Sequence, residues 1–341
     1  MLETFSLASV LVVTKNNKDI IDRNLRSIFY QSYDNIEVVI IDSSDDESEQ
    51  IIKQCIRNVN KKNFDVKYVH TKPKGVGAAR NMAILACSGD YIIFLDADCY
   101  LPEDYVARAM ELFLQDDKIL TINITIKHDS KEKGLFARVL YLYDRARMRA
   151  LGSSSKEDYF NFLTCRKQVF DLVGFFDDGL EAGEDLEWIA RSEKCYKRSK
   201  SKGYKSVASD IVMFEEKGAW SLSQYWRKCL WYGGAFADFD YLKTGILPMA
   251  ELFLMFTQVT YPVSLLLLLL HTLSYTFFIA HTLIFLAPTF YIIYKVCKQK
   301  NPSSILALIP LLIFYKSFFL LLGAMSKLCG KFRGSFGDAF R

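Results

Sequence analysis

The sequence predicts an α/β domain with a mostly parallel sheet, followed by a C-terminal transmembrane helical region. Short apolar strands alternate with helix-period segments over residues 6–215, and polar residues close each of the first four strands. Long, almost uncharged apolar runs follow residue 244. Alternating strands and helices favour a parallel sheet covered by helices on both faces, and apolar runs of about 20 residues match the thickness of a bilayer core.

The first elements follow from two periodicities. Four short runs rich in β-branched or aromatic residues and bounded by polar turns predict strands. These strands are expected at Val10–Val13, Val38–Ile41, Val66–Val69 and Tyr91–Leu95. Segments with helical spacing of apolar residues separate them. These helices are expected at Ile20–Gln31, Glu47–Asn58, Gly77–Cys87 and Pro102–Leu114.

The polar residues that close the strands are the first place to look for a site. Ligands of such sheets bind at the carboxyl ends of the strands. The strand-closing segments are Thr14–Asn17, Asp42–Asp46, Thr71–Lys74 and Asp96–Asp98.

Two carboxylates follow the fourth strand. The apolar run Tyr91–Leu95 leads directly into Asp96-Ala-Asp98. Alternate residues of an extended segment point the same way, so both side chains could face one hard cation such as Mg²⁺ or Mn²⁺. Such an ion would hold a diphosphate. A solvated surface turn is the alternative, and the position at a strand exit favours a functional role.

A glycine-rich segment with cations opens the third helix. Lys72, Lys74 and Arg80 flank Gly75 and Gly77. Exposed backbone amides and cations suit phosphate, which indicates a nucleotide. Arg80 stands where a dinucleotide fingerprint has its third glycine, so the match to an NAD site is poor. A helix start with solvated lysines is the alternative.

Adjacent acids follow Gly183. Glu184 and Asp185 begin a predicted helix, where they could satisfy unpaired backbone amides. They could also supply a general base. The residues alone leave both interpretations open.

The order of these motifs resembles the inverting family 2 glycosyltransferases of GT-A fold. The resemblance spans about residues 6–220. It is carried by Ser9–Asn17, Ile36–Asp46, Gly75–Asn81, Phe94–Asp98 and Gly183–Asp185. The ordered set is specific where each member alone is not.

The resemblance implies a role for each strand-closing residue. Asp42 would hold the uracil or ribose of a nucleotide, and Thr14 and Asn17 would line the same pocket. Asp96 would face the ribose and a metal ion, and Asp98 would bind the metal that bridges the diphosphate.

The resemblance also implies the catalytic pair. Asp185 would deprotonate the acceptor hydroxyl, with Glu184 beside the acceptor. Arg227, in the segment Gln224–Lys228, would help to close the donor site.

Three positions depart from the family pattern. The usual proline and tyrosine near the first strand are Thr14 and Asn16 here. A histidine that can bind the metal after the last strand has no match, and Glu215 or Glu216 stands near its place.

Three apolar runs predict transmembrane helices. They are Ala250–Leu270, Thr276–Val296 and Ser303–Leu322. The link at residues 295–300 carries three lysines, which places it and the N-terminal domain on the cytoplasmic side. A buried helical hairpin of a soluble protein is the alternative.

The expected organisation has four parts in a multi-pass protein of the cell membrane. Residues 1–220 form the GT-A domain and 221–245 an interfacial amphipathic linker. Residues 246–328 form about three transmembrane helices, and 329–341 a basic tail.

The charge distribution and the cysteine content bear on the class of protein and on the redox state of its thiols. Residues 244–341 hold eight Lys or Arg against two acids, and the preceding part is nearly neutral, which argues against a nucleic-acid binder. Eight cysteines without a CxxC pair indicate reduced thiols.

The sequence therefore predicts a metal-dependent, hexosyltransferase-type glycosyltransferase. Its donor would be a nucleotide sugar, with UDP favoured, and its partners membrane lipids and a lipid-linked or glycolipid acceptor. Two alternatives stay open: a polyprenyl-phosphate sugar synthase, and a non-catalytic membrane scaffold that keeps the nucleotide fold.

Overall fold

The computed structural model divides the chain into two compact units, residues 1–129 with 156–218 and 341, and residues 130–155 with 219–340. The structure describes residues 6–59, 64–72, 75–128, 159–180, 183–198, 202–215, 221–236 and 274–283. It also describes single residues at 140, 260, 264, 267, 269, 316, 318, 319 and 322.

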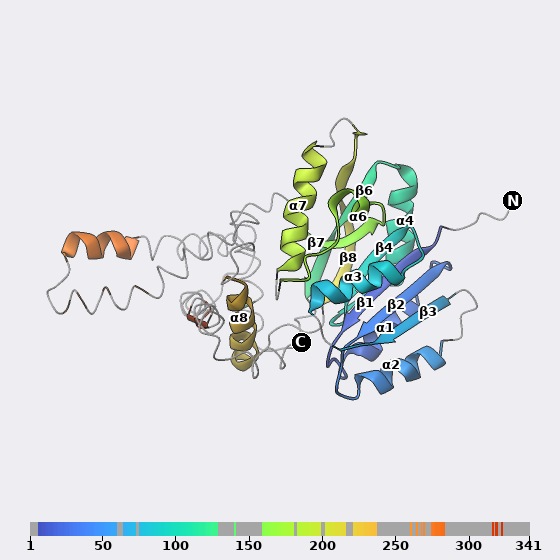
Figure 1. Cartoon of the computed structure of the whole chain (residues 1–341), viewed down its shortest axis with the longest axis horizontal. Coiled ribbons are helices and arrows are strands. Elements are labelled where there is room, and N and C mark those ends of the chain that lie inside the picture. The colour runs from blue at the N-terminus through green and yellow to red at the C-terminus, as the bar shows by residue number, and fades with distance from the viewer. Residues whose placement is uncertain are drawn as a thin grey trace. The chain divides into compact units, whose positions relative to one another are not determined.

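The first unit is built on a mixed β-sheet. Over its described residues the sheet has eight strands in the order β3-β2-β1-β4-β7-β6-β8-β5 (Figure 1). The strands are β1 (Ala8–Thr14), β2 (Ile36–Asp42), β3 (Phe64–His70), β4 (Tyr91–Asp96), β5 (Cys99–Tyr100), β6 (Ile119–His128), β7 (Tyr159–Arg166) and β8 (Lys205–Glu215).

The expectation of a mostly parallel sheet holds for only one half. Strands β3, β2, β1 and β4 pair in parallel. Strand β7 is antiparallel to both β4 and β6, and β5 is antiparallel to β8, while β6 and β8 are parallel. Parallel neighbours need a crossover connection, usually a helix. The regular alternation that indicates such crossovers ends after residue 115, and beyond it the sheet is mixed.

Helices cover both faces of the sheet (Figure 1). They are α1 (Ile21–Phe29), α2 (Ser48–Arg57), α3 (Val76–Ala86), α4 (Tyr105–Gln115), α6 (Val169–Val173) and α7 (Glu184–Arg198). The second unit contains α8 (Leu222–Phe236). The four predicted helices and four predicted strands are confirmed, with ends that differ by a few residues.

Successive side chains of the central strands pack alternately into two separate hydrophobic cores. Val10 and Val12 pack into the core that contains Leu25 of α1, together with residues of α2 and α4. Leu11, between them, packs into the core that contains Ala83 of α3, with residues of α6 and α7. This period of two is what a strand buried on both faces requires. It fixes which helices lie on which side of the site.

Glu37 of β2 is an acidic residue buried in the sheet, and it is only 1% exposed. Its carboxylate accepts hydrogen bonds from Ser9 Oγ at 2.6 Å, Ser88 N at 2.7 Å and Lys67 Nζ at 2.5 Å. Burial by itself would raise the pKa of Glu37, but these hydrogen bonds outweigh it and lower the pKa to about 2. The charged carboxylate therefore ties β1, β2 and β3 to the turn before β4.

A lowered pKa in the folded state predicts a loss of stability in acid. The hydrogen bonds of the charged Glu37 carboxylate contribute fully to the free energy of unfolding above the pKa that Glu37 has in the unfolded chain. This contribution disappears as the pH falls towards 2. From the two pKa values we expect a loss of up to about 3 kcal/mol in the free energy of unfolding. Urea unfolding should show wild type and Glu37→Gln converging between about pH 5 and pH 2. The exposed Asp65, opposite Glu37 on β3, provides the control Asp65→Asn, whose difference from wild type should stay small throughout.

Most residues of the predicted membrane spans lie outside the described part of the chain. Residues 276–283 of the second run belong to a helix at 275–283. Among the residues that the structure describes, no helix has both the length and the apolar character needed to cross a bilayer. The expected transmembrane region is therefore unsupported by the described residues, and it stays a prediction.

Candidate functional site

The carboxyl ends of four adjacent strands meet at one edge of the sheet. Thr14 of β1 pairs with Asp42 of β2, and Asp42 pairs with His70 of β3. On the other side of β1, Val13 pairs with Asp96 of β4. Neighbouring strands lie about 4.8 Å apart, so the ends of β2 and β4 are about 10 Å apart. Carboxylates therefore stand on both sides of the end of β1.

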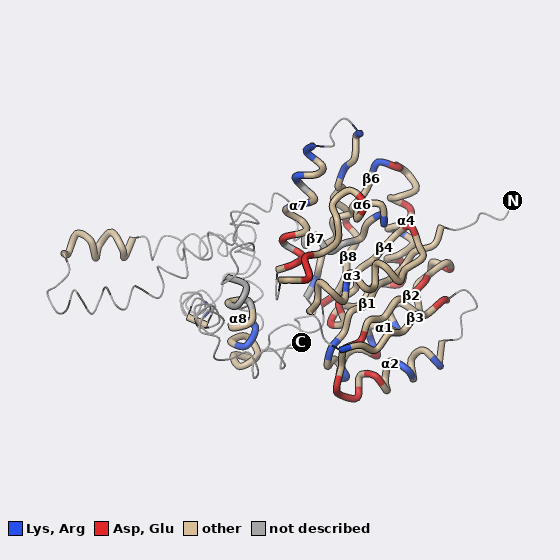
Figure 2. The backbone as a smooth tube through the Cα atoms, in the orientation of Figure 1, with Lys and Arg blue, Asp and Glu red and all other residues tan. Residues whose placement is uncertain are grey.

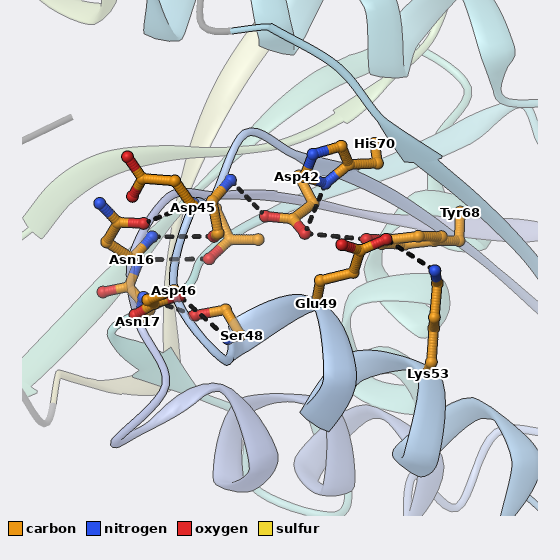
Figure 3. Close-up of polar contacts among 12 residues, drawn as sticks. Asn16, Asn17, Asp42, Asp45, Asp46, Ser48, Glu49, Lys53, Tyr68 and His70 are labelled. Atoms are coloured by element: carbon orange, nitrogen blue, oxygen red, sulfur yellow. Dashed lines mark hydrogen bonds and ion pairs between the residues drawn. The ribbon is translucent and has the colours of Figure 1, made fainter.

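Asp42 is a fully buried acid whose carboxylate is held by three groups. Its Oδ1 accepts a hydrogen bond from Ser44 N at 2.9 Å. Its Oδ2 accepts one from the Tyr68 hydroxyl at 2.9 Å and lies 3.3 Å from His70 Nδ1 (Figure 3). Burial and the neighbouring Asp42 raise the pKa of Tyr68, so its hydroxyl stays protonated and donates. The carboxylate is fixed in orientation before any ligand arrives.

Hydrogen bonds join the loop after β1 to the loop after β2. Asn16 N donates to Ser44 Oγ at 2.8 Å, and Asp45 N donates to Asn16 Oδ1 at 3.0 Å. Asn17 N donates to Ser48 Oγ at 3.0 Å (Figure 3). Asn16 has a φ of 55°, a left-handed conformation that asparagine adopts more readily than most residues. The two loops form one rigid corner around Asp42.

The structure brings three of the predicted nucleotide residues together in this corner. Thr14 and Asp42 are register partners, and Asn17 Nδ2 donates to Thr14 Oγ1 at 3.2 Å. Their contact with a nucleotide stays a prediction. Tyr68 and His70 were missed, although the register of parallel strands could have indicated them. His70 ends its strand beside Asp42, and Tyr68 lies two residues earlier on the same face.

The turn after β4 displays the two predicted metal ligands. Asp96 and Asp98 are both partly exposed. The Cys99 thiol donates to Asp98 Oδ1 at 3.7 Å, and burial raises the pKa of Cys99, which keeps the thiol protonated. Glu215 of β8 pairs with Cys99 in the sheet.

A divalent cation fits the chemistry of this turn. Carboxylate oxygens are the ligands that Mg²⁺ and Mn²⁺ prefer, and Mg²⁺ is commonly held by one or two carboxylates together with substrate phosphates. Asp96 and Asp98 supply that number. Within the described part of the chain, no group of three or more His, Cys, Asp or Glu side chains is arranged to hold a metal.

Arg80 of α3 joins the turn after β4 to the start of α7. Its guanidinium donates to Glu184 Oε1 at 2.6 Å and to Asp96 Oδ1 at 3.0 Å. The side chains of Arg80 and Glu184 are 5% and 6% exposed, so this ion pair is buried. The Phe176 ring centroid lies 5.6 Å from the guanidinium carbon. The sequence predicted that Arg80 faces phosphate; the structure places it between two carboxylates, and its contact with a donor stays a prediction.

The rest of the glycine-rich motif docks the segment 174–180 onto α3. A Cβ on Gly77 would lie 2.8 Å from the backbone oxygen of Asp177, so this position needs glycine. Asn81 Nδ2 donates to Phe176 O at 2.9 Å, and Phe176 N donates to Asn81 Oδ1 at 2.9 Å. The motif therefore positions the predicted catalytic pair.

Acids gather in the first turn of α7. The backbone N–H of Glu187 donates a hydrogen bond to the backbone oxygen of Gly183. The residue Gly183 has a φ of 81°. Glu184, Asp185 and Glu187 occupy the first turn and basic residues the last, as Figure 2 shows, which is the arrangement that the helix dipole favours. Glu184 is buried, and burial raises the pKa of its carboxyl, whereas Asp185 is only partly buried. Asp185 is the more accessible of the predicted catalytic pair.

Two further predicted residues are not tested by the geometry of the sheet edge. Lys74 falls outside the described residues, as does Glu216. Arg227 is an exposed residue of α8 in the second unit, with its guanidinium carbon 5.8 Å from the Trp226 ring centroid. The roles of Lys74 and Arg227 stay predictions.

Several known proteins resemble this chain in sequence. Residues 9–174 match the family described as Glycosyl transferase family 2. Glycosyltransferase GlyA of Streptococcus pneumoniae serotype 4 is 33% identical over 211 residues, which cover 62% of this chain and 27% of that protein. The Escherichia coli protein WfaP, named UDP-Glc:α-D-GlcNAc-diphosphoundecaprenol β-1,3-glucosyltransferase, is 31% identical over 141 residues, covering 38% of this chain and 51% of that protein. The chain thus spans about half or less of these relatives.

A solved structure shares the fold. The mannosyltransferase PcManGT from Pyrobaculum calidifontis, determined in complex with GDP-Man and Mn²⁺, aligns with a TM-score of 0.53 at 16% identity. The alignment covers 95% of this chain and 87% of that one.

Proposed function

We propose, from the membership of residues 9–174 in glycosyl transferase family 2, that this chain is an inverting glycosyltransferase. It moves a sugar from a nucleoside-diphosphate sugar to a hydroxyl of a lipid-linked glycan or glycolipid. One observation carries the proposal. Arg80 joins Asp96, at the strand exit, to Glu184, at the start of the helix that bears Asp185. Groups suited to a diphosphate and a group suited to proton abstraction therefore belong to one connected site.

The corner around Asp42 would bind the nucleoside. The carboxylate can accept hydrogen bonds from a base N–H or a ribose hydroxyl, and its orientation is already set by Ser44, Tyr68 and His70. Preorganisation of this kind lowers the cost of binding. The donor proposed is a UDP-sugar.

Asp96 and Asp98 would hold Mg²⁺ or Mn²⁺ against the diphosphate. A bound divalent ion would supply Lewis-acid stabilisation of the leaving nucleoside diphosphate. Arg80 holds one oxygen of Asp96, which restricts the directions in which the carboxylate can face. PcManGT was determined in complex with GDP-Man and Mn²⁺, which supports the use of a divalent ion here.

Asp185 would act as the general base. Its carboxylate accepts the proton of the acceptor hydroxyl while the oxygen attacks the anomeric carbon from the face opposite the leaving group, which inverts that carbon. Glu184 cannot take this part as readily, because it is buried against Arg80. It would instead fix the start of α7 beside the acceptor.

The membrane setting of the proposal rests on the second part of the sequence. Three apolar runs begin at residue 250, and α8 carries aromatic and basic residues together, as segments at the lipid headgroup level do. WfaP is named for an acceptor that is a lipid diphosphate, which supports a lipid-linked acceptor here. We therefore propose a multi-pass membrane protein whose catalytic domain lies on the cytoplasmic side.

Two alternatives make different predictions. A polyprenyl-phosphate sugar synthase has an acceptor that is already an anion, so it would need no base at Asp185. A membrane scaffold that keeps the nucleotide fold would bind a nucleotide without turnover. Asp185, next to the Glu184 that Arg80 holds, favours transfer to a hydroxyl over both alternatives.

The proposal is tested with the full chain purified in lipid bilayers. We expect release of a nucleoside diphosphate from one nucleotide sugar of a panel, requiring Mg²⁺ or Mn²⁺ and a lipid-linked acceptor. Asp98→Asn should abolish this turnover because it removes a ligand charge, whereas Asp90→Asn, an exposed acid just before β4, should behave as wild type. Full turnover of Asp98→Asn in excess chelator would refute the metal assignment. Nucleotide binding without any transfer would favour the scaffold.

A further inference from the structure

A row of polar side chains on α1 faces the segment that follows β4. Asn24, Ser27 and Gln31 are spaced three and four residues apart, which places them on one face of the helix and its C-terminal extension. Ser27 Oγ accepts a hydrogen bond from Leu101 N at 3.1 Å. Gln31 donates to Pro102 O at 2.6 Å and accepts from the backbone N of residue 106 at 2.9 Å. The row anchors the chain from the end of β4 to the start of α4.

Asn24 holds the part of this segment that bears the two carboxylates. Its Nδ2 donates to the backbone oxygens of Asp96 at 2.9 Å and of Cys99 at 2.7 Å. These two oxygens bracket the turn that contains Asp98. A single amide group thus clamps both ends of the turn, from the face of the sheet opposite to Arg80.

The chemistry of the contact requires an amide. Both neighbours of Nδ2 are carbonyl acceptors, so the –NH₂ group, and not the oxygen, must face them. The side chain is 1% exposed, and among the described residues its Oδ1 is buried with no hydrogen-bond partner. A buried acceptor without a partner destabilises the fold, and an apolar residue would avoid that cost. The two N–H groups are the property that distinguishes asparagine from such a residue here.

We propose that Asn24 is a positioning residue that sets the turn on which Asp96 and Asp98 are displayed. The inference rests on the proposed function, because these carboxylates are its cation ligands. The hydrogen bonds of Asn24 go to the backbone oxygens of Asp96 and Cys99, so it acts through the backbone on either side of Asp98. It should therefore govern the binding of a divalent cation with a nucleoside diphosphate, and leave the corner around Asp42 unchanged.

Two variants and one control separate positioning from general stability. Asn24→Leu keeps a similar size without donors. Asn24→Asp keeps the shape but turns a carboxylate towards two carbonyl oxygens, so its effect should be at least as large. Gln31→Met is the control, because Gln31 belongs to the same row but anchors only residues beyond the turn.

The first measurement is hydrogen exchange of the backbone amides of residues 97–101 in the full chain. We expect faster exchange in both Asn24 variants and little change there in Gln31→Met. The second is calorimetric titration of Mn²⁺ in the presence of UDP, and separately of GDP. Mutation of outer-shell partners of metal ligands typically lowers metal affinity by about 10- to 100-fold. We expect a loss in that range for Asn24→Leu, a loss at least as large for Asn24→Asp, and little change for Gln31→Met. Uridine binding without metal should not change.

Each unfavourable result has a separate meaning. Unchanged exchange in the turn would overturn the positioning role. Faster exchange with unaltered Mn²⁺ affinity would also overturn it, because Asn24 would then be a structural anchor alone. A wild-type chain that binds neither Mn²⁺ with UDP nor Mn²⁺ with GDP would contradict the proposed function. The exchange data would still decide whether Asn24 holds the turn.

Discussion

Asp185→Asn is expected to lower turnover by a factor of about 10² to 10⁴, the usual range for a lost general base. Asparagine keeps the shape of the side chain and caps helices about as well as aspartate, so the fold should persist. It cannot accept a proton at neutral pH. The measurement is single-turnover transfer to a hydroxyl acceptor, together with a binding isotherm for the donor nucleotide, which should not change.

A matched control lies in the same helical turn. Glu187→Gln removes an acid from the first turn of α7 and its ion pair with Arg191, but this acid is not a candidate base. It should reduce turnover only slightly. If Asp185→Asn also turned over at nearly the wild-type rate, Asp185 would have a structural role. Nearly wild-type turnover of Asp185→Asn with a polyprenyl-phosphate acceptor would favour the polyprenyl-phosphate sugar synthase.

Arg80→Met should have the largest effect on stability. The substitution leaves the Glu184 carboxylate buried without its cation and removes a partner of Asp96. Breaking a buried ion pair from one side typically costs about 3–5 kcal/mol. Chemical unfolding monitored by tryptophan fluorescence should show a loss of this size, and turnover should fall with it because the start of α7 moves.

The double variant Arg80→Met with Glu184→Gln identifies the cause. Removing both charges should recover much of the stability, since no uncompensated charge is left. Arg108→Met is the control: Arg108 pairs with the exposed Asp210 and should cost less than about 1 kcal/mol. An Arg80→Met protein of wild-type stability that had lost only donor binding would instead support the phosphate role predicted from the sequence.

Local patterning explains how much of this site the sequence could predict. Strands β1 to β4 and helices α1 to α4 have clear periods of two and 3.6, and parallel strands bring their carboxyl ends to one edge. Asp42 and the pair Asp96 and Asp98 follow from that rule alone. Predicting that Tyr68 and His70 of β3 lie beside Asp42 requires the register of the sheet, that is, the pairing of β2 with β3 residue by residue.

Long-range partners explain what the sequence could not predict. The glycine-rich segment has the composition of a phosphate loop, but Arg80 meets Glu184, which lies 104 residues later. Asn24 donates a hydrogen bond to the backbone oxygen of Cys99, 75 residues later. Every residue has a backbone oxygen, so no residue type in the sequence indicates this acceptor. The mixed half of the sheet has the same origin, because β7 pairs with β4 across a separation that no local pattern records.

The separation between Arg80 and Glu184 also bears on the order in which the site forms. Contacts between residues distant in the chain form at a higher entropic cost than local ones. The Asp42 corner is held by hydrogen bonds among residues 14–48 and strand β3, whereas the contact of Arg80 needs a partner 104 residues away. We therefore expect the corner to form at a lower entropic cost than that contact. Under the proposed function, nucleotide binding would depend on the corner, and sugar transfer would depend also on the contact between Arg80 and Glu184.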